Sequence, residues 1–122
     1  MFEILEDKTI CLTRGDVASI EVAVSQPDGN PYEFMRGDIV RLSVYKKNGC
    51  GSVLLKKDVK VDEKTEVVAI DLEAKDTRFC DIINEPTEFW YDIKLNPETE
   101  PQTIVGYDRE GEKIFLLYPE GR

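Results

Sequence analysis

Apolar and polar residues alternate along most of the chain with a period of two. The clearest run covers residues 89–95, FWYDIKL, in which every second side chain is apolar. Such alternation is typical of a β-strand with one buried and one exposed face. The pattern predicts strands over 9–13, 16–25, 38–47, 53–61, 65–72, 87–95, 102–107 and 112–118, and a short edge strand over 2–5. The residues expected in the core are Ile20, Val22, Leu42, Val44, Ile70, Tyr91 and Ile93.

Turn-forming residues separate these runs. Pro and Gly cluster with Asp and Asn at 27–31, and Asn and Gly recur at 48–51, as is typical of tight chain reversals. The segment 73–79 breaks the alternation and contains good helix formers, which predicts one or two helical turns crossing between sheets. Strands that recur at short intervals with tight turns indicate an antiparallel sandwich or barrel. A length of 122 residues fits a single β-sandwich domain over 1–122.

The segment from Leu72 to Cys80 resembles the corresponding part of an immunoglobulin variable domain. The core tryptophan of such domains is missing from the third strand, because the only tryptophan is Trp90. The pattern therefore favours an all-β, immunoglobulin-like antiparallel β-sandwich over a true immunoglobulin domain. We expect about seven to nine strands with one short helical crossover.

The charge balance excludes several function classes. The chain has 16 Lys and Arg against 25 Asp and Glu, a net charge of −9, which opposes binding to nucleic acid or to an anionic membrane surface. With no histidine, a Ser-His-Asp triad and an imidazole metal site are impossible. No apolar run approaches the roughly 20 residues of a membrane span, and the start lacks the pattern of a signal peptide. We therefore expect a non-enzymatic protein without cofactor or metal, made in the cytoplasm.

The three cysteines, Cys11, Cys50 and Cys80, are widely spaced and odd in number. No CxxC motif is present, so a zinc-ribbon or redox motif is excluded. We expect three free thiols, since disulfides belong mainly to secreted proteins. A Cys11–Cys80 disulfide is the alternative.

Two Arg-Gly-Asp triplets occur, at 14–16 and 36–38, each just before a predicted strand. The triplet is known as an integrin ligand, but a turn is the simpler explanation. Glycine permits a positive φ, and aspartate can accept hydrogen bonds from nearby backbone N–H groups. We therefore expect both triplets to be structural.

The most informative single residue is Trp90, which falls among the outward-facing positions of its strand. Either it is exposed as an interface anchor, or the terminal residues or the helical crossover cover it. Tyr45 is expected to face outward on a second strand. Lysines at 46–47 and 56–57 form a basic stretch that either contacts an acidic surface of another subunit or keeps a strand edge soluble. The candidate partner surface consists of Trp90, Tyr45, Lys46 and Lys47.

The order of several short motifs gives a resemblance. Gly-Asp precedes a strand at 15–16 and again at 37–38, Asp-Gly-Asn-Pro-Tyr lies between them at 28–32, and Asp-Thr at 76–77 is followed by Tyr-Asp-Ile at 91–93. In this order, over residues 9 to 118, the chain resembles phage and prophage proteins similar to the N-terminal immunoglobulin-like domain of baseplate upper proteins. It departs from them at Pro86-Thr87, where they have glycine, and at Phe89, where they have tyrosine.

The resemblance implies a structural role. The chain would be a component of a phage tail or baseplate, made in the host cytoplasm and carried in the virion. It would act by contact with phage structural proteins, with itself, or with both, and without catalytic residues. The alternative is a bacterial immunoglobulin-like module that binds carbohydrate or a cell-surface partner.

Overall fold

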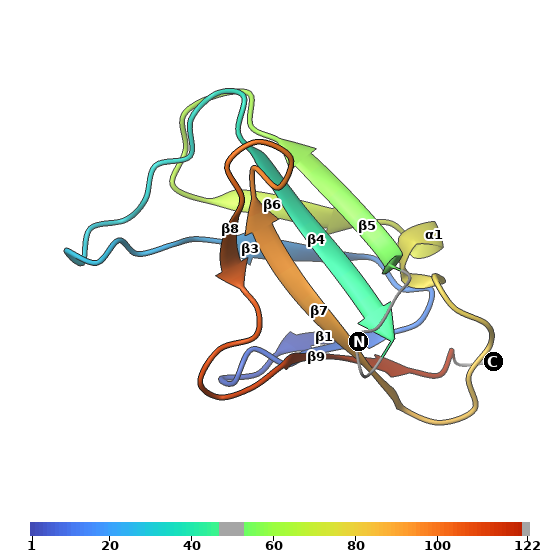
Figure 1. The fold of residues 1–122 in the computed structure, drawn as a ribbon. Helices are drawn as coiled ribbons and strands as arrows, with labels where there is room; N and C mark the ends of the chain where they lie inside the picture. Colours follow the sequence, from blue (N-terminus) through green and yellow to red (C-terminus); the bar gives the residue numbers. More distant parts are fainter. Residues whose placement is uncertain (47–52, 121–122) are drawn as a thin grey trace.

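The computed structural model describes residues 1–46 and 53–120 (Figure 1). Within these residues, the alternating pattern forms strands at nearly all predicted positions, and the segment after Leu72 forms the predicted short helix. The elements are β1 (Phe2–Ile4), β2 (Ile10–Thr13), β3 (Ala18–Val22), β4 (Ile39–Lys46), β5 (Val53–Lys60), β6 (Val68–Leu72), α1 (Ala74–Thr77), β7 (Thr87–Leu95), β8 (Gln102–Val105) and β9 (Lys113–Tyr118).

The strands form two sheets. The main sheet has seven strands in the order β1-β2-β9-β7-β4-β5, with β8 paired to β7, and the second sheet is the antiparallel pair β3-β6. Figure 1 shows β3 and β6 crossing behind β4 and β7. The helix α1 carries the chain from β6 in the second sheet to β7 in the main sheet.

The core lies between the two sheets. Ile20 and Ile70 from the small sheet are buried in one cluster with Leu42, Tyr91 and Phe115 from the main sheet. All seven core residues predicted from the alternation are buried, with at most 5% of any side chain exposed. Period-two alternation therefore identified the inner face of each strand correctly.

The expectation of an antiparallel sandwich is wrong for one pair of strands. β2 and β9 run parallel, with Ile10 beside Phe115 and Thr13 beside Tyr118, so the main sheet is mixed. A tight hairpin makes its two strands antiparallel, but β2 and β9 come from opposite ends of the sequence and no hairpin joins them. Side chains alternate between the two faces in parallel and in antiparallel strands alike, so the sequence pattern carried no information on strand direction.

The second Arg-Gly-Asp triplet forms a turn, as expected. Gly37 has a φ of +95°, which favours glycine. The Asp38 carboxylate accepts hydrogen bonds from the Met35 N–H (2.9 Å) and from the Asn96 side-chain amide (3.2 Å). These contacts fix the turn before β4 and join it to the end of β7.

Cys11 and Cys80 are free thiols, and Cys50 lies outside the described residues. The alternative Cys11–Cys80 disulfide is therefore not formed. Burial raises the pKa of the Cys11 thiol, which lowers its reactivity in the folded protein.

Thiol titration tests this assignment. We expect three reactive thiols per chain in denaturant without reductant, and slower reaction of Cys11 in the native protein. A titre of one thiol in denaturant would contradict the assignment, because it would require a disulfide.

Candidate binding surfaces

A row of apolar side chains crosses the face of the main sheet that points away from β3 and β6, here named the outer face. The strand register places Ile114 beside Trp90, Trp90 beside Tyr45, and Tyr45 beside Val53. The first three side chains are partly buried and Val53 is exposed. Tyr45 and Trp90 are therefore direct neighbours on adjacent strands, both facing outward as predicted.

A hollow of about 370 Å³ lies on the outer face beside Trp90. It forms where the neighbour of β7 changes. Residues Thr87–Tyr91 of β7 pair with β9, and the pairing with β8 begins at Ile93, so Asp92 lies at the changeover. The connection between β8 and β9 leaves the sheet at this point. The lining residues are Tyr45, Trp90, Tyr91, Asp92, Tyr107, Glu112 and Lys113.

Two polar atoms of residues that line this hollow are shielded from solvent without a hydrogen bond. They are the donor Nε1 of Trp90 and the acceptor Oδ1 of Asp92, and neither has a partner among the described residues. The second carboxylate oxygen of Asp92 accepts a hydrogen bond from the Tyr45 hydroxyl at 3.1 Å. Unpaired buried polar atoms are rare in folded proteins because each costs about 1–3 kcal/mol.

Burial raises the pKa of the Asp92 carboxyl, and the Tyr45 hydrogen bond and the charge of Lys94 oppose this shift only in part. Lys113 also lines the hollow, but its ammonium lies 2.8 Å from the Asp108 carboxylate and is almost fully buried there. The carboxylate of Asp92 is therefore held in an environment that disfavours its charge.

An Asp92→Asn variant tests this electrostatic assignment. Because the folded-state pKa of Asp92 is raised, its charge destabilises the fold at pH values above that pKa, and the effect disappears below the ordinary aspartate pKa. We expect the stability of the variant relative to the wild type to increase as the pH rises from the ordinary aspartate pKa to the raised pKa of Asp92. Urea unfolding at several pH values measures it, with the exposed Asp81→Asn as control. A relative stability independent of pH would contradict the assignment.

A second surface lies at the side of the sandwich, where the small sheet does not cover the main sheet. β6 lies next to β5, and no described strand pairs with the other edge of β3. A cleft of about 170 Å³ runs beside this edge, with Ile4, Ile20 and Val105 among its lining residues. The edge of β3 and this cleft, with the exposed side chain of Ile4, are named the open flank.

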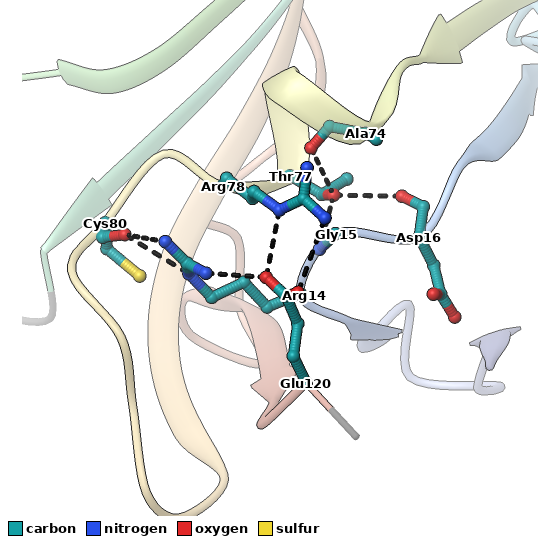
Figure 2. Close-up of polar contacts among 8 residues, drawn as sticks. All are labelled: Arg14, Gly15, Asp16, Ala74, Thr77, Arg78, Cys80 and Glu120. Carbon is teal, nitrogen blue, oxygen red and sulfur yellow. Dashed lines mark hydrogen bonds and ion pairs between the residues drawn. The ribbon is translucent and has the colours of Figure 1, made fainter. Parts of the chain in front are cut away.

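The first Arg-Gly-Asp triplet is part of a polar cluster that joins the turn after β2 to α1 (Figure 2). Thr77 is fully buried, and its hydroxyl accepts a hydrogen bond from the Gly15 N–H and donates to the Asp16 carbonyl, both at 2.9 Å. Arg14 donates two hydrogen bonds to the Cys80 carbonyl, at 3.2 and 2.8 Å. These internal contacts give the triplet a structural role, as the sequence predicted.

Glu120 completes the cluster from the C-terminal side. Its carboxylate lies 2.6 Å from Arg14 and 3.0 Å from Arg78 (Figure 2). Gly15 has a φ of +87°, and a Cβ there would lie 2.8 Å from the Glu120 carboxyl carbon. The positive φ favours glycine here, and a Cβ would also require the Glu120 and Arg78 side chains to shift.

Comparisons of the chain with models of protein families, with curated proteins and with solved structures give no match. The described residues contain no group of three or more Cys, Asp or Glu side chains that could hold a metal ion. None of the described helices is long and apolar enough to cross a membrane.

The structure separates Lys46 of the predicted partner surface from the aromatic residues of that surface. Lys46 is exposed and pairs with Phe89, so it projects from the opposite face to Tyr45. Lys47 lies outside the described residues. Lys57 forms an ion pair with Asp76 at 2.9 Å. Lys56 pairs with Ser43 and shares the face of Tyr45, whereas Lys46 and Lys57 share the opposite face, so the described lysines of the predicted basic stretch do not form a single surface.

Sequence reasoning identified Tyr45 and Trp90 of the hollow but missed Asp92 and Tyr107, among others. Asp92 is two residues from Trp90 on the same outward-facing series, so the alternation contained a signal for it. Tyr107 lies between β8 and β9 and reaches the hollow only because of the chain path there. No local pattern marked it.

Proposed function

We propose that this chain is a non-catalytic structural or adaptor module of a phage tail or baseplate that acts by protein–protein contact. The short motifs on which the resemblance rests support a structural role, because they form turns, a crossover and a strand of the fold. The two Gly-Asp pairs form turns before β3 and β4, Asp76-Thr77 belongs to the crossover, and Tyr91-Asp92-Ile93 lies in β7.

The strand order supports an immunoglobulin-like arrangement for this module. β9, β7, β4 and β5 follow one another in the main sheet and face the pair β3-β6. This agrees with strands G, F, C and C′ of a variable-type domain packed on strands B and E. On this assignment β3 corresponds to strand B, whose second edge is normally paired with strand A.

The open flank is the structural feature that most supports the proposed protein–protein contact. The exposed apolar side chain of Ile4 lines the cleft between the sheets together with Ile20 and Val105. An unpaired strand edge above apolar surface favours addition of a further strand from another chain. The structure thus offers both backbone hydrogen-bonding groups and a place for side chains.

We propose that the occupant is an extended segment of a neighbouring tail protein, with apolar residues at alternate positions and basic residues between them. The apolar residues fit the cleft beside β3. One acidic residue, Glu21, and one basic residue, Lys8, line the cleft, and the chain as a whole carries a charge of −9. This charge favours a basic partner over a second copy of the same acidic chain.

Immunogold electron microscopy tests the assembly role. Antibodies against the purified chain are applied to particles released after prophage induction in the strain that carries the gene. We expect label at the tail end of the particles, and no label after pre-absorption of the antibody with purified protein. Unlabelled particles, with the chain left in the cell lysate, would contradict the proposal.

A further inference from the structure

The hollow on the outer face has the chemistry of a small-molecule site, and it is separate from the open flank. Its volume of about 370 Å³ lies within the roughly 300–1,000 Å³ of ligand pockets. The aromatic side chains of Tyr45, Trp90 and Tyr107 line it together with a few polar groups. This combination of aromatic walls and convergent polar groups is the usual composition of such sites.

The unpaired polar atoms restrict which ligand fits. Trp90 Nε1 offers a donor and Asp92 Oδ1 an acceptor, and both residues face the same side of β7. An organic cation satisfies only the carboxylate, and an anion satisfies only the indole N–H. A hydroxyl group both donates and accepts, so neighbouring hydroxyls on one ligand satisfy both atoms.

The aromatic walls select further among hydroxyl-bearing ligands. Tyrosine and tryptophan present a flat apolar surface with a polar group at its edge. A pyranose ring has the complementary shape, because its C–H bonds form an apolar face and its hydroxyls project from the rim. We propose that the hollow binds a sugar unit, with the ring against Tyr107 and Trp90 and the hydroxyls bonded to Trp90 Nε1 and Asp92.

Access and electrostatics are consistent with this ligand. The Tyr107 side chain is 78% exposed, so it can reorient against a sugar ring without loss of core contacts. Hydrogen bonds donated by hydroxyls stabilise the charge of Asp92, which burial disfavours. The ammonium of Lys113 is held by Asp108, so it does not compete for Asp92. The inference does not depend on the assembly role, since it uses a different surface.

Tryptophan fluorescence tests the proposal, because Trp90 is the only tryptophan in the chain. The probes are the methyl glycosides of glucose, galactose and N-acetylglucosamine, with tetramethylammonium chloride and sodium sulfate as a cation and an anion. We expect a saturable change with at least one glycoside. Saturation-transfer NMR with the same glycosides detects binding that leaves the fluorescence unchanged.

Variants then locate the binding. We expect Tyr107→Ala to weaken glycoside binding about tenfold through loss of the ring contact, and Asp92→Asn to weaken it through loss of the charged acceptor. Ile82→Ala is the matched control, because Ile82 is 81% exposed and lies outside the hollow. Three results would each overturn the proposal: no glycoside binding by either method, equal binding by the Tyr107→Ala and Ile82→Ala variants, or a response to tetramethylammonium or sulfate alone.

Discussion

Replacing Phe115 with alanine is expected to lower the free energy of unfolding by about 3–5 kcal/mol. The side chain of Phe115 is fully buried between the sheets on β9. Its ring makes edge-to-face contacts with Phe79, at 5.7 Å between centroids, and with Tyr91, at 6.4 Å. Truncation removes these contacts and leaves a cavity that the surrounding strands cannot fill, because β9 is paired on both sides. Urea unfolding followed by circular dichroism measures the loss.

Phe2→Ala provides the control for the same chemical change. Phe2 lies on the edge strand β1 and is 37% exposed. We expect a distinctly smaller loss of stability, since the transfer and cavity terms both decrease when a side chain is already in contact with water. Equal losses for the two variants would contradict the position of Phe115 at the centre of the core.

Replacing Thr77 with valine is expected to cost about 1–3 kcal/mol, although the two side chains have nearly the same shape. The fully buried hydroxyl of Thr77 accepts from the Gly15 N–H and donates to the Asp16 carbonyl. Valine leaves both backbone groups unpaired in a place that water does not reach. The same urea measurement reports the change.

Thr77→Ser separates the hydrogen bonds from the packing. Serine keeps the hydroxyl and removes only a methyl group, so we expect a smaller loss than for valine. If serine proves more damaging than valine, the methyl contact rather than the hydroxyl holds α1 to the turn after β2. The assignment of Thr77 as the polar link between these segments would then be wrong.

The sequence contained most of the local structure of this fold. Alternation predicted the strands and the inner face of each, as Ile20, Leu42 and Ile93 illustrate. The break in alternation after Leu72 predicted the helix that crosses between the sheets. These features depend on near neighbours in the chain, and the side-chain pattern records them directly.

The relations between distant strands were harder to predict. The parallel pairing of β2 with β9 depends on how the two ends of the chain meet. The contact between Tyr45 and Trp90 follows from the register of β4 and β7, and Tyr107 reaches the hollow through the connection after β8. Their positions in the sequence grouped the lysines in one basic stretch, but the described ones are divided between the two faces of the sheet, Lys56 on one and Lys46 and Lys57 on the other. Such features arise from register and chain path, which alternation alone does not encode.

The most direct test of the proposed function is site-specific cross-linking from the edge of β3 inside assembled particles. A photo-reactive amino acid replaces Glu21, which is exposed and lines the cleft of the open flank. The same substitution at Glu63, which is exposed and lies outside that cleft, is the control. We expect a covalent product between the Glu21 position and a different tail protein, through an extended basic and apolar segment, and none from Glu63. No product from Glu21, equal products from both positions, or a cross-linked dimer of this chain would contradict the proposed function.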